Sequence, residues 1–180
     1  MAPLETARLI LRELQDSDTA DLVAVFADAY AQRFYPDMTN DAAARAWIHR
    51  NRERYAQDGF GLWAVIDRQS GTLISDCGLT FQDVAGTRLL EIGYHIAPGW
   101  RGRGLALEAA RAAMAYGFAV TNEVEIGSIV APDNVSSASV ARRLHNNVRR
   151  YINTRGLDRC LFFTTRDEFV AETYTKMTAR

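Results

Sequence analysis

The chain contains 180 residues, of which 48% are hydrophobic and 24% are charged, and its formal net charge at pH 7 is −1. A chain of this length can bury a hydrophobic core without the help of disulfides or metal ions. We therefore expect one domain over residues 1–180, whose central part spans about 8–166. The near-neutral charge argues against an overall electrostatic grip on nucleic acid or on an acidic membrane.

The remaining composition excludes further classes of protein. The two cysteines stand in apolar runs and no Cys/His spacing suits zinc, so the sequence predicts neither a disulfide scaffold nor a metal site. The chain shows no basic and apolar leader and no apolar run of membrane-spanning length, which predicts a cytoplasmic protein without a membrane partner. Arginines crowd the C-terminal quarter, but the overall charge argues against a nucleic acid partner.

The first third of the chain reads as a strand followed by two helices. Residues 8–12 are predicted to form the strand, and the capping segment 15–18 precedes the first helix. Asn40 or Asp41 is predicted to cap the second helix, and Gly59 to end it.

Three strand-like runs follow, at residues 60–66, 73–81 and 88–96, with turns predicted at 67–72 and 83–86. The last part of the chain is predicted to be helical at 105–120, extended at 124–130, helical from 133–134 to 144, and extended near 148–153 and 159–165. The resulting order is β-α-α-β-β-β-α-β-α-β-β. It predicts an α/β (α+β) domain in which helices flank a mixed central sheet.

The loop between the strand at 88–96 and the helix at 105–120 carries the strongest functional signal. It contains a Pro-Gly break, glycines and two arginines before an alanine-rich helix, a pattern that turns backbone N–H groups toward an anion. The predicted pyrophosphate cradle consists of Arg101, Gly102, Arg103, Gly104, Leu105 and Ala106. A dinucleotide-binding motif would need glycine where Leu107 stands, and a Walker loop would need Gly-Lys-Ser/Thr. A plain basic surface loop is the remaining alternative.

The spacing of Arg101, Gly104 and Ala106 resembles the pyrophosphate-binding signature of the GCN5-related N-acetyltransferase (GNAT) superfamily. Four further segments resemble the RimJ/RimL branch, which is named for enzymes that acetylate the N-terminal amine of ribosomal proteins: residues 5–12, 59–65, 91–94 and 132–137. The resemblance covers nearly the whole chain. It implies the acyl-CoA N-acyltransferase (GNAT) fold, with acetyl-CoA as acetyl donor and an amine as acceptor.

Acetyl transfer to an amine needs a group that takes the amine proton, and Glu91 is the predicted catalytic base. Alternation along its strand puts Glu91, Gly93 and His95 on one face, so substrate can approach the strand at the glycine. A solvent-facing or ion-paired Glu91 is the alternative, and His95 is more simply a structural polar residue.

The resemblance also implies further contacts to the cofactor. The backbone of Tyr94, His95 and Ile96 is expected to pair with the pantetheine arm, and one N–H there can polarise the thioester carbonyl. Asn134 resembles a pantetheine-contacting asparagine, with Ser137 beside it, although an ordinary helix N-cap is the alternative.

Two positions depart from the family pattern. Ala141 stands where many acetyltransferases carry the tyrosine that protonates the thiolate. The usual glycine at the end of this helix is replaced, so Asn146 or Asn147 is predicted to adopt the left-handed helix end.

The acceptor site is predicted to be lined by Phe34, Tyr35, Met38 and Trp63, for which a place in the core is the alternative. The predicted activity is direct transfer of the acetyl group, in a ternary complex, to a primary amine of a small molecule or of a peptide or protein N-terminus. The alternative is a non-catalytic acyl-CoA-binding module. The sequence leaves open the acceptor, the thiolate's acid, the role of His95 and whether the chain forms a homodimer.

Overall fold

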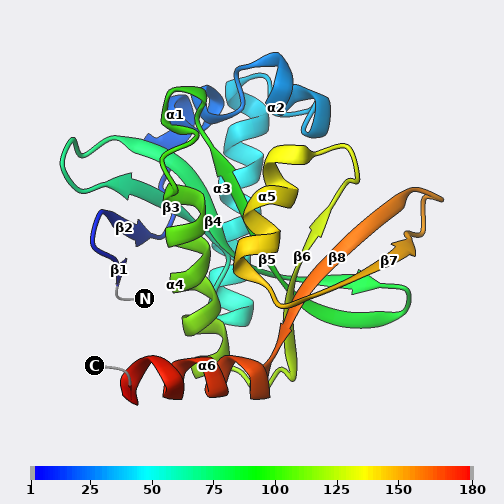
Figure 1. Cartoon of the computed structure of the whole chain (residues 1–180). Coiled ribbons are helices and arrows are strands. Elements are labelled where there is room, and N and C mark those ends of the chain that lie inside the picture. The colour runs from blue at the N-terminus through cyan, green and yellow to red at the C-terminus, as the bar shows by residue number, and fades with distance from the viewer. Residues whose placement is uncertain (1–2, 179–180) are drawn as a thin grey trace. The chain divides into compact units, whose positions relative to one another are not determined.

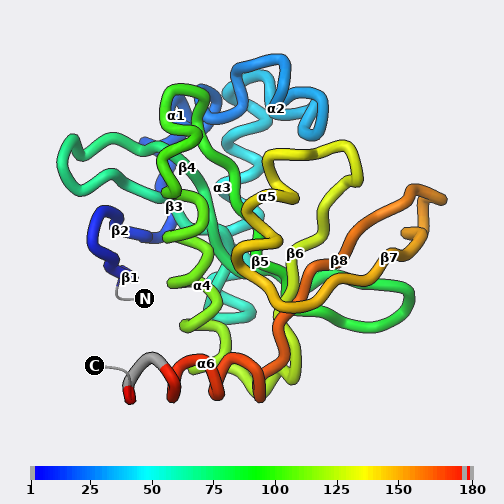
Figure 2. Tube along the Cα trace, viewed as in Figure 1, coloured from blue at the N-terminus to red at the C-terminus, as the bar shows by residue number. Residues whose placement is uncertain are grey.

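The computed structural model of the chain describes residues 3–178, apart from the side chains of residues 176 and 177 (Figures 1 and 2). Met1 and Ala2, at the start of the segment in which no leader was recognised, lie outside the described residues. The chain forms two compact units. The first comprises residues up to Thr80 together with Gly93–Ala113, and the second comprises Phe81–Ile92 together with residues from Met114 onward.

Short antiparallel strands form the sheet of the first unit. They are β1 (Leu4–Glu5), β2 (Leu9–Arg12), β3 (Leu62–Asp67), the first part of β4 (Leu73–Val84) and the end of β5 (Thr87–Ile96). Leu11 lies opposite Leu4 on one side and Val65 on the other. Leu9 and Leu11 are fully buried whereas the residues that follow each are half-buried, which is the alternation expected of a strand with one face on the core.

Four helical segments follow β2, where the sequence predicted two helices. They are the 3₁₀ turn η1 (Asp16–Asp18), α1 (Thr19–Val25), α2 (Ala29–Phe34) and α3 (Asp41–Asp58). The first predicted helix is divided because the Asp28 side chain accepts the Ala31 N–H and so starts a new helix. The second prediction is confirmed at both ends: Asn40 accepts the Ala43 N–H, and Gly59 ends α3 with φ of 80°.

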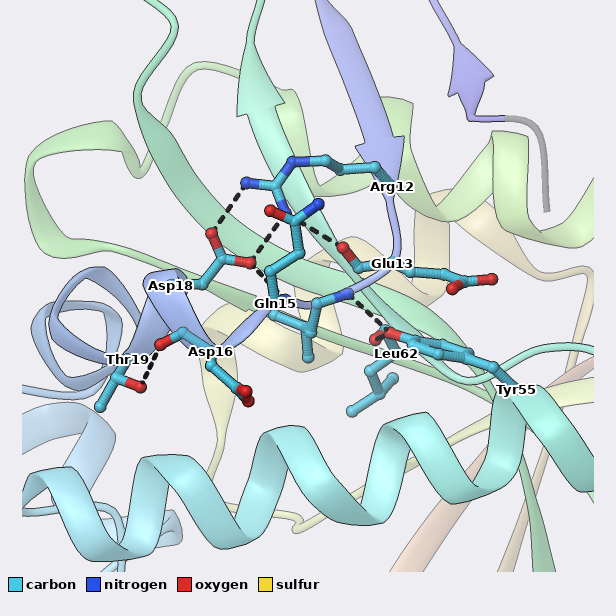
Figure 3. Close-up of polar contacts among 9 residues, drawn as sticks. Arg12, Glu13, Gln15, Asp16, Asp18, Thr19, Tyr55 and Leu62 are labelled. Carbon is cyan, nitrogen blue, oxygen red and sulfur yellow. Dashed lines mark hydrogen bonds and ion pairs between the residues drawn. The ribbon is translucent and has the colours of Figure 1, made fainter.

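Polar contacts hold the chain between β2 and α1 (Figure 3). Two nitrogens of the Arg12 guanidinium donate to the Asp18 carboxylate at 2.7 and 2.8 Å, and this contact raises the pKa of Arg12. The Tyr55 hydroxyl of α3 accepts the Leu14 N–H at 3.2 Å and donates to the Leu62 carbonyl at the start of β3. Burial raises the pKa of Tyr55, so this hydroxyl stays protonated and keeps its donor role.

The core of the first unit lies between these helices and the sheet. Its buried members come from α1, α2, α3, β3, β4 and the connecting segments: Leu14, Leu22, Val25, Phe26, Ala31, Met38, Ala44, Ile48, Ala64 and Leu73. Each element therefore contributes apolar side chains to one cluster, which fixes where the helices lie on the sheet.

The second unit consists of strands and helices from the middle and the C-terminal part of the chain. It contains the end of β4, the start of β5, β6 (Glu125–Val130), β7 (Asn147–Ile152) and β8 (Asp158–Thr165), with α5 (Val135–Leu144), α6 (Arg166–Thr178) and the end of α4 (Leu105–Val120). β5 pairs with β6 in parallel, and β6 pairs with β8 antiparallel. Within residues 3–178, the strands are hydrogen-bonded in the order β1-β2-β3-β4-β5-β6-β8-β7. This mixed eight-stranded sheet with flanking helices confirms the predicted fold class.

Three local expectations need correction. The two-residue strand β1 and the C-terminal helix α6 were not predicted from the sequence. The left-handed helix end predicted at Asn146 or Asn147 is wrong, because within residues 3–178 Ala85 is the one residue other than glycine with positive φ. Helix α5 instead ends in extended backbone at His145, with φ of −113° and ψ of 154°, since the chain enters β7 at once.

Candidate functional site

The predicted phosphate loop has the backbone shape that its glycines suggested. After the 3₁₀ turn η2 (Pro98–Trp100), Gly102 and Gly104 both have φ of 77°, a conformation that favours glycine. Added Cβ atoms would have space, with nothing within 4 Å at Gly102 and only an Arg8 nitrogen at 3.8 Å from Gly104. Helix α4 begins at Leu105, so its first N–H groups lack intrahelical partners and carry the positive end of the helix dipole. These residues fit a pyrophosphate group.

The first turn of α4 is held by the segment that connects β1 to β2 in the same unit. The Glu108 carboxylate accepts hydrogen bonds from the Thr6 hydroxyl at 2.6 Å and from the Arg8 backbone and Nε at 3.0 and 2.7 Å. Burial by itself would raise the pKa of Glu108, but these hydrogen bonds lower it below its ordinary value. Arg8 also donates to the Arg103 carbonyl at 3.1 Å, so it links the segment between β1 and β2 to the glycine loop before α4.

Both arginine side chains of the loop have protein partners. The Arg101 guanidinium donates to the Asp28 carboxylate at 2.5 and 3.0 Å and to the Ile96 carbonyl at 3.1 Å. Arg103 donates to the Gly99 carbonyl at 3.0 Å and lies over the Trp100 ring. Their predicted side-chain contacts to phosphate stay a prediction, and the backbone amides are the groups that the loop geometry favours.

Removing the Asp28 side chain is expected to destabilise the protein by about 1–2 kcal/mol, because Asp28 both caps α2 and pairs with Arg101. Urea unfolding of Asp28→Ala measures this loss. Asp28→Asn is the matched control, since asparagine retains the cap and should recover most of the loss. Arg101 lowers the pKa of Asp28, so the contribution of the ion pair is present above the ordinary carboxyl pKa and is lost as pH falls through the lowered value. Equal destabilisation by both variants would contradict the capping role.

Glu91 lies in the second unit, where β5 and β6 pair. Backbone pairing joins Leu90 to Ile126 and Glu91 to Gly127. After Glu91 and Gly127, side chains connect the two strands. Glu91 Oε1 accepts the Ile129 N–H at 3.2 Å, and the Ser128 hydroxyl donates to the Ile92 carbonyl at 2.9 Å. The catalytic role of Glu91 stays a prediction, and its carboxylate is anchored to the backbone of β6.

The structure brings together a group that the sequence analysis did not assemble. In the first unit, His95 Nδ1 of β5 lies 2.5 Å from Asp76 Oδ1 of β4, and Trp47 Nε1 of α3 donates to Asp76 Oδ2 at 2.8 Å. Asp76 is fully buried, and the His95 side chain is 10% exposed. This pair could have been predicted from the turn expected at 83–86. A two-residue turn at 85–86 joins the two strands and places position 76 opposite position 95.

The four predicted lining residues lie in the first unit. The Tyr35 ring lies 4.3 Å from the His95 ring, between centroids, and Phe34 packs edge-on against Tyr30. Met38 is buried in the core cluster and Trp63 is fully buried, as the alternative interpretation of these aromatic and apolar residues expected. Contact with an acceptor stays a prediction for all four.

The residues predicted on α5 lie in the second unit. The Asn134 side chain accepts the Ser137 N–H at 3.1 Å, so the N-cap interpretation is confirmed and the contact to pantetheine stays a prediction. Ala141 is fully buried in a cluster with Val130 and Phe162, so this position offers no hydroxyl to protonate a thiolate.

In the described part of the chain, no group of three or more His, Cys, Asp or Glu residues is placed to hold a metal ion. Among residues 3–178, no helix combines the length and the apolar character needed to cross a membrane.

Comparison with known proteins places this geometry in a family. Residues 8–146 match the model of the family described as Acetyltransferase (GNAT) domain. The uncharacterized protein YkkB of Bacillus subtilis (strain 168) is 31% identical over 142 residues, which cover 78% of this chain and 83% of YkkB. The uncharacterized N-acetyltransferase YoaA of the same strain is 33% identical over 138 residues, covering 74% and 76%.

The fold is shared with solved acetyltransferases. The structure of RimL, the ribosomal L7/L12 α-N-protein acetyltransferase, in complex with coenzyme A matches 92% of this chain and 99% of its own with a TM-score of 0.73 at 16% identity. This neighbour supports the resemblance to the RimJ/RimL branch at the level of the fold. The chain belongs to the acetyltransferase (GNAT) family and is an acetyl-CoA-dependent acetyltransferase.

Proposed function

We propose that the protein transfers the acetyl group of acetyl-CoA to a primary amine by direct attack in a ternary complex. The observation that carries the proposal is the loop with left-handed Gly102 and Gly104 leading into α4, which fits a pyrophosphate group in a chain of the GNAT family. The acceptor is a small-molecule amine or the N-terminus of a peptide or protein. RimL, named for acetylating a ribosomal protein, supports the second class of acceptor.

Bound acetyl-CoA supplies an activated thioester, and the residues of this chain bind it and manage the amine protons. Backbone amides at 101–106 hold the pyrophosphate, and the backbone of Tyr94, His95 and Ile96 takes the pantetheine arm. Glu91 takes a proton from the nitrogen. Asn134 and Ser137, at the start of α5, add contacts to the cofactor.

The cysteines favour direct transfer over an acetyl-enzyme. An acetyl-enzyme on cysteine needs an accessible thiolate. Burial raises the pKa of Cys77, which has no exposed surface, so its thiol stays protonated. Cys160 lies within β8 and packs beside Val130 and Phe162. Neither residue is placed as a nucleophile.

The cofactor loop is tested by substituting a glycine that needs its left-handed backbone. Gly104→Val is expected to weaken acetyl-CoA binding at least tenfold in calorimetric titration, because valine disfavours φ of 77° and turns the amides away. Gly156→Val is the matched control: Gly156 has φ of 73° in the turn between β7 and β8 and nothing within 4 Å of an added Cβ. Equal affinity in the two variants, or no binding by the unaltered protein at millimolar acetyl-CoA, would contradict the proposed cofactor site.

Catalysis is tested by an acceptor screen scored by product mass and thiol release. The panel compares small primary amines with N-terminal peptides of ribosomal proteins. Because Ala141 removes the usual acid, tight acetyl-CoA binding without acetylation of any acceptor would favour the non-catalytic module. Acetylation of a single ribosomal N-terminus would select the protein substrate over small amines.

A further inference from the structure

A buried carboxylate in the first unit has histidine as its charge partner. Asp76 has no exposed surface, and its two carboxylate oxygens contact His95 Nδ1 at 2.5 Å and Trp47 Nε1 at 2.8 Å. Within residues 3–178, no lysine or arginine forms an ion pair with Asp76. A buried carboxylate is costly unless its charge is compensated, and His95 is the contacting group that can become a cation.

The contact with Asp76 sets which nitrogen of His95 can act. An ionised carboxylate accepts hydrogen bonds, so it holds the hydrogen on Nδ1 and leaves the lone pair of the neutral ring on Nε2. In the described part of the chain, Nε2 has no hydrogen-bond partner, and the side chain is 10% exposed. A proton taken at Nε2 converts the buried charge of −1 on Asp76 into a neutral ion pair with His95.

The fold fixes the position of both residues. The Ala97 N–H donates to the Ile74 carbonyl at 2.9 Å, and two residues back along this antiparallel pair His95 lies opposite Asp76. Side chains of directly opposed residues share one face of a sheet. The pair is therefore held by the backbone of two adjacent strands, and its geometry does not depend on a loop.

Aromatic side chains at the ends of α1 and α2 and within α3 surround the His95 ring. Ring centroids lie at 5.0 Å for Phe26 after α1, 4.3 Å for Tyr35 after α2 and 5.9 Å for Trp47 of α3. The titratable groups among these contacts are the Asp76 carboxylate and the Tyr35 phenol. Aromatic faces attract an ammonium group, so this environment suits an amine that approaches Nε2 in its protonated form.

We propose that His95 is a proton-accepting residue for the acceptor amine and that Asp76 positions it; this inference rests on the proposed N-acetyltransferase function. His95 Nε2 takes one proton from the ammonium, and the freed nitrogen lone pair attacks the thioester carbonyl carbon. The carbon–sulfur bond breaks with its electron pair leaving on the CoA thiolate. The nitrogen loses its second proton as the amide forms, and the reaction yields the amide, CoA thiol and one proton. Glu91 is the predicted acceptor of the second proton.

The test uses the full chain with three variants: His95→Gln, Asp76→Asn and, as control, His49→Gln. His49 is an exposed histidine of α3 that pairs with Glu53, so its loss should leave activity unchanged. His95→Gln is expected to lower kcat by about 10²–10⁴-fold with acetyl-CoA affinity retained.

Nitrogen NMR of the unaltered protein measures which ring nitrogen of His95 carries the hydrogen, and the proposal requires that Nε2 be the free one. The chain has three histidines, so the His95 signals are assigned by comparing the histidine variants. The neutral ring is expected as the Nδ1–H tautomer. In Asp76→Asn the amide donates to Nδ1 and favours the Nε2–H tautomer, and kcat should fall while the acetyl-CoA affinity stays.

Each outcome decides a separate question. Thiol release by the unaltered protein together with full activity of His95→Gln would overturn this inference and leave the proposed function standing. An Nε2–H tautomer in the unaltered protein would overturn it also, even if a variant failed to fold. No thiol release by the unaltered protein with any amine of the panel would overturn the proposed function, and this inference with it.

Discussion

Replacing Glu91 with glutamine is expected to lower kcat by about 10²–10⁴-fold and to leave acetyl-CoA affinity nearly unchanged, because glutamine keeps the shape of the side chain but cannot take a proton. Its amide oxygen can still accept the Ile129 N–H, so the contact to β6 is retained. Steady-state rates across a pH range, with calorimetric titration of acetyl-CoA, measure the two effects separately.

Glu125→Gln is the matched control for this experiment. Glu125 starts β6 and pairs with Arg149 at 2.6 Å, so it shares the unit and the residue type but not the predicted role. An unchanged rate-versus-pH profile in Glu91→Gln would move the role of base to His95 or to bound water. Because Glu91 and His95 are proposed to accept different protons, the double variant is expected to be slower than either single variant.

Lowering the pH from 7 to 5 is expected to destabilise the fold by about 2 kcal/mol through His145 alone. Burial lowers the pKa of His145 to about 3, against about 6.5 in an unfolded chain. Below about pH 6.5 the histidine of the unfolded state therefore binds a proton, whereas that of the folded state stays neutral. The free energy of unfolding decreases as the pH decreases, until the folded-state pKa is reached. The neutral ring stays in contact with Ser128 and Thr164, whose hydroxyl oxygens lie 3.1 and 3.2 Å from its nitrogens.

Urea unfolding at pH 7 and pH 5 tests this expectation, with His145→Gln compared with the unaltered protein. Glutamine does not titrate, so the difference in unfolding free energy between the two pH values should shrink by about 2 kcal/mol. His49→Gln is the control, because it removes a histidine whose side chain is exposed on the surface of α3. The same pH dependence in His145→Gln and the unaltered protein would show that His145 is not the cause.

The positions of Asp76 and His95 bear on the choice of acceptor. The His95 ring is surrounded by aromatic rings of the helical segments, so we expect its acceptor to be a primary amine with little bulk beside the nitrogen. Both a small metabolite amine and the free N-terminus of an extended peptide have that shape. The His95 variant therefore tests the chemistry shared by the two classes of acceptor, and the acceptor screen tests the difference between them.

Elements with local sequence signals could be predicted without the structure. Helix α4 was predicted at the residues where it forms, because its alanine-rich run follows the glycine loop directly. The cap and the glycine at the ends of α3 were predicted for the same reason, since both act within a few residues of the helix. The left-handed loop glycines were also readable, because the motif needs φ values that glycine tolerates.

The contacts between polar side chains that are distant in the sequence became known from the tertiary structure. Arg101 and Asp28 stand 73 positions apart, so no local pattern showed that the loop arginine would pair with the cap of α2 instead of remaining free for phosphate. Asp76 and His95 stand 19 positions apart and are joined by the register of two strands, while Trp47 reaches the same carboxylate from a helix. The end of α5 was misjudged because the chain turns directly into β7, where pairing with β8 sets the backbone in place of a helix cap. The physical reason is common to these cases: propensity and capping act between neighbours in the chain, whereas ion pairs, buried charges and strand register depend on residues brought together by folding.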